Sequence, residues 1–294
     1  MRPLDPQAAQ ARPSALVVLD VRSEEAYSRG HLAGSGNIPR AELVARRAEL
    51  PTRATAILVV AERATDAREA AAVLGGLEYR DVTFLDASLA ELSGGLDDRG
   101  PGARLWHPAP FLAEVLPRLL GHPAEAQSGP GTPPVTPRPR ALDLAAGSGR
   151  DAVFLAQQGF DVEAWDHAPE ALERARDLAR RQGVRLHAVL CDVEQPDLPP
   201  PGRPFDLVIC FRFLHRPLFP WIERALVPGG WLVYETFLMG QERFGRPRRP
   251  HFLLARGELA RSFPGLVTVR YEEREPETGP LTARLLARKP PERD

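Results

Sequence analysis

Two acidic residues, with a run of small residues between them, carry the plainest chemistry in this sequence. Asp143 ends one apolar run, a small-residue turn follows over 145–149, and Asp166 ends a second apolar run. Gly147 and Gly149 let the backbone adopt positive φ and come close to a ligand. A carboxylate at the end of the second run is placed to accept hydrogen bonds from ribose hydroxyls. These residue types at this spacing predict a site for a nucleotide-like ligand.

The elements that position these residues follow in the order strand, tight turn, helix, strand over 141–166. In an open parallel sheet such turns lie at the carboxyl ends of the strands, where nucleotide-like ligands bind. The match of 147–152 to GxGxxA is a weak signal for NAD, whose pyrophosphate prefers helix amides without carboxylates nearby. Asp143 and Asp151 flank the turn with negative charge, which favours a cationic ligand instead.

The segment 143–149 resembles motif I of class I methyltransferases, whose cofactor S-adenosylmethionine carries a sulfonium and an ammonium. Ala145 departs from the motif, which has its first glycine there. Further segments follow in the order of that family: strands at 187–198, 204–215 and 231–237, a turn at 228–230, and a closing antiparallel pair at 266–273 and 282–289. The resemblance implies a Rossmann-like α/β fold, with a mostly parallel seven-stranded sheet and an antiparallel last strand.

The resemblance also implies a set of cofactor-binding residues. Asp166 would bind the ribose, and Asp192 would lie beside the adenine. The expected set is Asp143, Ala145, Gly147, Gly149, Arg150, Asp166, His167, Asp192, Val193 and Phe211. The implied reaction is in-line SN2 transfer from the sulfonium, driven largely by approximation of donor and acceptor. No metal site is expected.

The first hundred residues form a different unit. Alternating strand and helix patterns predict a small α/β domain with a parallel sheet. It resembles the rhodanese family through Asp20-Val21-Arg22, Gly30-His31-Leu32, Gly34 and Asn37-Ile38-Pro39, and His31 is interpreted as a residue that stabilises this loop. Active rhodaneses carry a cysteine thiolate where this chain has Ala61, and sulfur transfer needs that thiolate. We therefore expect a non-catalytic interaction or scaffold domain.

Pattern and composition predict the domain boundaries. The rhodanese-like domain is assigned to 1–98 and the methyltransferase domain to 103–294. Apolar residues at helical spacing predict a helix within 103–121, which we assign to the second domain. Trp106 either caps the cofactor or anchors this helix. The Pro/Gly-rich stretch 122–140 is expected to be an extended, mobile loop.

Composition excludes several other classes of protein. Basic side chains number 38 and acidic ones 39, so electrostatics do not favour a nucleic-acid partner. Cys191 and Cys210 are the two cysteines; both are interpreted as buried small side chains, which suits a reducing compartment. The amino terminus lacks the apolar core of a signal peptide, and no apolar run reaches the roughly 20 residues that span a bilayer. The sequence predicts a soluble, cytoplasmic protein without a membrane partner.

The residues at the ends of the predicted strands 204–215 and 231–237 are candidates for the methyl acceptor's site. His215 is either a general base or a packing residue. Five arginines concentrate in 241–259, where Arg243, Arg246 and His251 are the substrate-binding candidates. This segment is either a solvated basic loop or a lid that recognises an anion by charge-assisted hydrogen bonds. It resembles the equivalent region of small-molecule methyltransferases of the tellurite-resistance type, which implies a small anionic or soft nucleophile as acceptor.

Two alternatives to a small-molecule methyltransferase stay open. The chain is either a small-molecule methyltransferase or a protein methyltransferase that docks its target through the rhodanese-like domain. A regulatory protein that binds S-adenosylmethionine without turnover is the rival from another class. Residues 209–214 lack the motifs of methyltransferases that act on nucleic-acid bases. The expected partners are therefore a small-molecule acceptor and a protein bound by the first domain.

Overall fold

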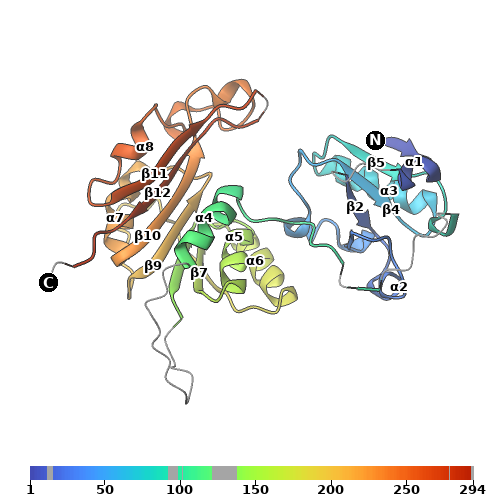
Figure 1. The fold of residues 1–294 in the computed structure, drawn as a ribbon, viewed down its shortest axis with the longest axis horizontal. Helices are drawn as coiled ribbons and strands as arrows, with labels where there is room; N and C mark the ends of the chain where they lie inside the picture. The colour runs from blue at the N-terminus through green and yellow to red at the C-terminus, as the bar shows by residue number, and fades with distance from the viewer. Residues whose placement is uncertain (12–15, 92–98, 101, 121–137, 278, 293–294) are drawn as a thin grey trace, which may run out of the picture. The chain divides into compact units, whose positions relative to one another are not determined.

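A computed structural model describes the chain except for residues 12–15, 92–98, 101, 121–137, 278 and 293–294. The chain divides into two compact units, Met1–His107 and Pro108–Asp294, each built around its own sheet (Figure 1). The predicted loop at 122–140 lies almost wholly outside the described residues. Among the helices of the described residues, none has the length and apolar character needed to cross a membrane.

The first unit is a five-stranded, fully parallel sheet with helices in its connections, which confirms the predicted fold. The strand order is β1 (Arg2–Leu4), β5 (Val82–Leu85), β4 (Ile57–Val60), β2 (Val17–Asp20) and β3 (Ser35–Asn37). The helices are α1 (Pro6–Gln10), α2 (Glu24–Ser28) and α3 (Ala64–Gly76). The central strand β4 is apolar at every position and wholly buried. Ser23 caps α2, because its hydroxyl accepts the Ala26 N–H.

Residues 103–107, which the sequence assigned to the second domain, belong to the first unit. The Ala103 N–H donates to the Ser35 carbonyl at 2.8 Å, and Leu105 lies in the core of the first unit. The structural boundary is therefore at His107–Pro108, not at residue 103. The helix predicted within 103–121 begins only at Pro110, because proline favours a first helical position and disfavours helix in the residue before it.

The second unit is a seven-stranded sheet with an antiparallel end, as the sequence predicts. The strand order is β11 (Val267–Arg274), β12 (Thr282–Arg288), β10 (Leu226–Phe237), β9 (Phe205–Phe211), β6 (Arg140–Leu144), β7 (Asp161–Asp166) and β8 (His187–Leu190). The strands from β10 to β8 in this order are parallel, whereas β12 runs antiparallel to β10 and to β11. The predicted turn at 228–230 lies within β10, at a break in its register with β9.

Helices cover both faces of this sheet (Figure 1). They are α4 (Pro110–Leu120), α5 (Arg150–Gln157), α6 (Pro169–Arg181), α7 (Phe219–Ala225) and α8 (Glu258–Arg261). Alternate residues of β9 face the two layers: Leu207 and Ile209 pack with α4 and α5, while Val208 and Cys210 pack with α7 and α8. All parallel crossovers contain a helix except the one between β8 and β9, where 191–204 runs as a loop. The side of the sheet at β8 is consequently open, and Leu190 is 63% exposed.

Candidate functional site

The Gly-rich turn joins β6 to α5 at the carboxyl edge of the second sheet. Ala145, Gly147 and Gly149 have φ values of 55°, 54° and 72°, so the turn passes repeatedly through the left-handed region. A Cβ at Gly149 would lie 2.6 Å from the Ala175 Cβ of α6, so only glycine lets this turn and helix pack so closely. A Cβ at Gly147 would meet nothing within 4 Å. Gly147 therefore offers open space to a ligand.

Asp166, at the end of β7, is tied directly to this turn. Its Oδ2 accepts the Gly147 N–H at 2.8 Å, and its Oδ1 accepts the Ala168 N–H at 2.9 Å. His167 is exposed, with its Nδ1 3.8 Å from the Asp166 Oδ1. Each Asp166 oxygen has a second lone pair for hydroxyl donors, so the carboxylate shapes the turn and remains able to bind a ribose.

Asp143, at β6, lies beneath the turn and is only 3% exposed. Its Oδ2 is buried with no hydrogen-bond partner in the described residues, while the Ala152 backbone N–H interacts with its carboxylate. Burial first, and then the nearby Asp151 and Asp166, raise the pKa of Asp143 well above its ordinary value. An orphaned carboxylate oxygen under a Gly-rich turn is suited to a cationic ligand.

Asp151, in the first turn of α5, was not among the predicted binding residues. Its Oδ1 accepts the Ala109 N–H at 2.6 Å, just before α4 begins. Burial raises the pKa of Asp151, and the charges of Arg212 and Arg150 oppose that shift. Asp151 therefore fastens the start of α4 beside the turn.

The remaining predicted cofactor residues follow neighbouring strands at the same edge. The Cys191 N–H donates to the Asp166 carbonyl at 3.0 Å, which brings the next residue, Asp192, beside Asp166. Asp192 is exposed, and its Oδ1 accepts the Glu194 N–H. The structure thus gathers at one edge Asp143, Ala145, Gly147, Gly149, Arg150, Asp166, His167, Asp192, Val193 and Phe211. Val193 is 6% exposed and belongs to the core, so it offers packing rather than a polar contact.

Arg212 is a second residue that the sequence reasoning missed. It directly follows β9 and has a φ of 58°, which is rare for a residue with a long side chain. Its N–H donates to the Glu235 carbonyl at 2.8 Å. No sequence signal marked this position, because a left-handed arginine is recognisable only from the backbone.

His215 lies between β9 and α7, half-buried, and no hydrogen bond of its imidazole is found in the described part of the chain. The next residue, Arg216, is a structural anchor. Its Nε and Nη2 bind the two Glu258 oxygens at 2.5 and 3.0 Å, and its other contacts are the carbonyls of His251 and Leu253. This pair of hydrogen bonds ties the end of the arginine-rich segment to the residues that follow β9.

The arginine-rich segment is a loop whose base is closed. Leu238 pairs with Leu254, and the Oε1 of buried Gln241 accepts the Leu281 N–H at 2.8 Å. Arg256 binds Glu273 and Glu275, so it has a structural role. By contrast, the described structure contains no ion pair of Arg243, Arg246, Arg248 or Arg249, all of which are exposed. No hydrogen bond in the described residues joins Arg243, Arg246 or His251 to the Gly-rich turn.

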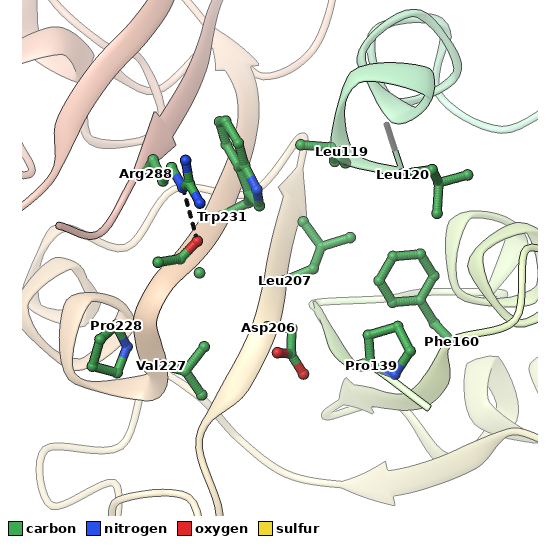
Figure 2. A pocket seen from close by; sticks show the side chains of 12 residues that line it. Leu119, Leu120, Pro139, Phe160, Asp206, Leu207, Val227, Pro228, Trp231 and Arg288 are labelled. Carbon is green, nitrogen blue, oxygen red and sulfur yellow. Dashed lines mark hydrogen bonds between the residues drawn. The ribbon is translucent and has the colours of Figure 1, made fainter. Parts of the chain in front are cut away.

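A cavity of about 360 Å³ lies at the opposite, amino edge of this sheet. Figure 2 shows Leu207 at its centre, with Asp206, Trp231 and Phe160 around it. Arg288 donates to the Gly229 carbonyl on one side. Since Asp206 begins β9 and Trp231 lies early in β10, this cavity is separate from the candidate site.

In the first unit, the loop that corresponds to the rhodanese nucleophile has no thiol. Ala61 is 2% exposed, and Arg63 pairs with Asp66 beside it. His31 is buried, with its ring nitrogens at 3.1 Å from the Leu32 and Gly100 carbonyls and its ring stacked on Tyr27. These contacts confirm a loop-stabilising role for His31.

The two cysteines of the chain are not activated. Cys210 is buried, and burial raises the pKa of its thiol to about 12. Cys191 is only half-buried, contrary to the predicted full burial, because it follows the exposed edge strand β8; its pKa is also raised, mainly by burial. Trp106 is buried and its Nε1–H has no partner in the described residues, while Arg104 lies over its ring at 4.6 Å.

Two families match the chain, one in each unit. The rhodanese-like domain matches residues 5–94, and a methyltransferase domain matches residues 141–230. The first unit thus carries a match to the rhodanese-like domain, and the second a match to a methyltransferase domain. The residues around Asp143 and Gly147 combine an orphaned carboxylate with open space, which fits a cationic cofactor such as S-adenosylmethionine.

Curated relatives match parts of the chain. The probable S-adenosyl-L-methionine-dependent methyltransferase TehB of Haemophilus influenzae is 25% identical over 90 residues, which is 30% of each chain. Hemagglutinin 1 of Eikenella corrodens is 32% identical over 99 residues, 31% of this chain and 32% of that protein. The chain thus spans about a third of the length of these relatives. The uncharacterized protein UNK4.09 of Schizosaccharomyces pombe is 25% identical over 297 residues, covering 82% of this chain and 83% of that protein, and so extends across both domains.

Proposed function

We propose that this protein transfers a methyl group from S-adenosylmethionine to a small anionic or soft nucleophile. The observation that carries the proposal is the buried, unpartnered Oδ2 of Asp143 beneath a turn that leaves open space at Gly147. A carboxylate in that position favours a ligand with positive charge and disfavours the pyrophosphate of a dinucleotide.

The residues of the chain would hold the cofactor as follows. Asp166 accepts ribose hydroxyls with the lone pairs that the backbone leaves unused, and Asp192 lies on the adenine side. Bound S-adenosylmethionine supplies an electrophilic methyl group on its sulfonium. The protein's contribution is to orient that group towards the acceptor, which is worth several kcal/mol when two reactants are held in line. A soft or anionic acceptor needs no strong base, so His215 need not abstract a proton.

The acceptor would approach from the side of the sheet where β9 and β10 end. Arg212 and His215 follow β9, and the loop with Arg243 and Arg246 follows β10. Guanidinium groups without acidic partners suit an anion, which supports a small anionic acceptor. A protein acceptor, docked by the rhodanese-like domain, is the second candidate, supported by the loss of the thiol at Ala61.

Calorimetry on the full-length protein tests the cofactor. S-adenosylmethionine and S-adenosylhomocysteine should bind, whereas NAD should not. Asp166→Ala should weaken S-adenosylmethionine binding by about 1–3 kcal/mol, the usual loss for a hydrogen bond to a charged group. Asp177→Asn, on the outer side of α6, is the matched control and should bind as the unaltered protein does. Tighter binding of NAD than of S-adenosylmethionine would refute the assignment.

Transfer of a labelled methyl group in a cell extract tests turnover. A labelled product of low molecular mass supports the small acceptor, and a labelled polypeptide supports the protein acceptor. If S-adenosylmethionine binds but no product appears, the chain is a cofactor-binding regulatory protein.

A further inference from the structure

The burial of Asp143 poses a charge problem in the ligand-free protein. Its side chain lies at the end of β6, under the Gly-rich turn and against α5. The residue is only 3% exposed to solvent. One backbone N–H, that of Ala152, interacts with the carboxyl, and Oδ2 has no partner in the described residues. An ionised carboxylate with an unsatisfied oxygen in such a place is costly.

The charged groups around Asp143 make the cost larger. Asp151 faces it from α5 and Asp166 from β7, and both repel a negative charge at Asp143. On β9, Cys210 carries a thiol whose pKa is raised and which therefore stays neutral. Arg150 and Arg212 lie near Asp151, where Glu235 of β10 adds a further negative charge. Glu235 itself is paired with Arg284 at 3.1 Å, so Arg284 is already engaged.

Two physical routes relieve such a site: a proton on one carboxyl, or a cation placed against it. We propose that Asp143 holds a proton in the ligand-free protein and releases it to solvent when the cationic part of S-adenosylmethionine enters. The O–H bond of the carboxyl breaks, the buffer takes the proton, and the carboxylate remains opposite the ligand's positive charge. Asp143 thereby selects ligands by charge, an inference that rests on the proposed function.

This exchange distinguishes adenosyl ligands that share the same nucleoside. S-adenosylmethionine carries a sulfonium and an ammonium, whereas 5′-methylthioadenosine has the nucleoside without either cation. Only a charged ligand can replace the proton, because a neutral one would leave an ionised Asp143 unpaired. Binding of the neutral ligand should therefore leave the proton in place.

Calorimetry in several buffers counts the released protons. The full-length protein is titrated with S-adenosylmethionine at about pH 6, below the α-amino pKa of about 7.7–8.0, so that the ligand's ammonium stays charged. The slope of binding enthalpy against buffer ionisation enthalpy should correspond to about one proton released. With 5′-methylthioadenosine the slope should be near zero.

Substitutions identify the residue that releases the proton. Asp143→Asn cannot release a proton, so its slope should fall to near zero and its affinity for S-adenosylmethionine should drop. Asp177→Asn, remote from the turn, should keep the slope. Because Asp143→Asn could disturb folding, infrared spectroscopy adds a second measurement that needs no ligand. The carbonyl band of a protonated carboxyl group should be present in the free protein, absent in Asp143→Asn and lost on saturation with S-adenosylmethionine.

The outcomes separate this inference from the proposed function. Binding of S-adenosylmethionine without proton release overturns the inference and leaves the function standing. A carboxyl band that survives in Asp143→Asn and disappears in Asp151→Asn also overturns it, because the proton then belongs to Asp151. Failure of the ligand to bind refutes the proposed function, while the infrared band still decides whether Asp143 is protonated.

Discussion

At the scale of single residues, the buried carboxyl of Asp143 lowers the stability of the ligand-free protein, although we propose that it favours binding of a cationic ligand. Its buried carboxyl binds a proton more tightly in the folded chain than in the unfolded one, since its folded pKa is raised. The folded state then holds more protons than the unfolded state above the ordinary pKa of an aspartate. Stability of the ligand-free protein must fall as pH rises through that window, up to the folded pKa. The residue that we propose attracts the cofactor thus weakens the ligand-free protein.

We predict that Asp143→Asn stabilises the ligand-free protein at neutral pH. An asparagine keeps an acceptor for the Ala152 N–H and carries no charge to bury. Between the ordinary pKa of an aspartate and the raised pKa of folded Asp143, the advantage of the variant should grow by up to about 1.4 kcal/mol per pH unit. Urea unfolding across that range measures it. A difference between variant and parent that does not change with pH would contradict the raised pKa.

Ala145 is the second residue whose conformation has an energetic consequence. Its φ of 55° is costly for a residue with a Cβ, and the methyltransferase motif has glycine there. We predict that Ala145→Gly stabilises the protein by up to about 1 kcal/mol, because relief of strain exceeds the entropy gained by the unfolded chain. Ala141→Gly, in the preceding strand β6, should destabilise it. Chemical unfolding of both variants is the measurement.

Most of the predicted cofactor residues lie together at one edge of the second sheet because they are local to one motif. Asp143, Gly147 and Asp166 belong to a strand–turn–helix–strand unit, whose spacing fixes where they lie. The structural role of Asp151 and the position of Arg212 were missed for physical reasons. The bond of Asp151 to Ala109 joins positions 42 residues apart, and the left-handed backbone of Arg212 depends on its tertiary surroundings.

At the scale of elements, the arginine-rich loop is firmer than the sequence implied. The segment, for which a solvated loop and a lid were both open, is closed at its base by the Leu238–Leu254 pair and held by the Arg216–Glu258 hydrogen bonds. Its exposed tip, with Arg243 and Arg246, is the part left to contact an acceptor. A role as substrate lid stays a proposal for that tip alone.

We predict that replacing both Arg243 and Arg246 by alanine raises the KM for the acceptor about tenfold or more, the size expected for a lost charge-assisted hydrogen bond. Affinity for S-adenosylmethionine should hardly change, since neither residue contacts the Gly-rich turn in the described structure. Arg256→Ala is the matched control: it removes the ion pairs with Glu273 and Glu275 and should lower stability without raising KM. A collapse of cofactor affinity in the double variant would move this loop to the cofactor site.

Element boundaries were the weaker part of the prediction. Strands β6, β7 and β9 lie where the apolar runs place them, because each is buried on both faces. The helix before them occupies only the later part of the predicted window 103–121, from Pro110, since two prolines interrupt the segment. Leu105, which precedes this helix, packs into the core of the first unit.

At the scale of the whole molecule, the second domain carries the proposed S-adenosylmethionine site and the first lacks the rhodanese nucleophile. We predict that the full-length protein produces no thiocyanate from thiosulfate and cyanide. Ala61→Cys should also fail, because a thiol alone does not remove Glu62 and Asp66, which repel an anionic sulfur donor. Colorimetric detection of thiocyanate is the measurement. Activity of the unaltered chain would contradict the reading of its first domain as non-catalytic.

The helix-free crossover between β8 and β9 has a consequence for chemical tools. The wall expected beside the adenine is a loop over 191–204, next to an edge strand whose Leu190 is exposed. A loop yields to bulk more readily than a packed helix does. Cofactor analogues enlarged at the adenine N6 position should therefore enter this protein more easily than methyltransferases with a helix there. Such analogues, carrying a transferable alkyne in place of methyl, would tag the acceptor of this chain within a mixture of other methyltransferases.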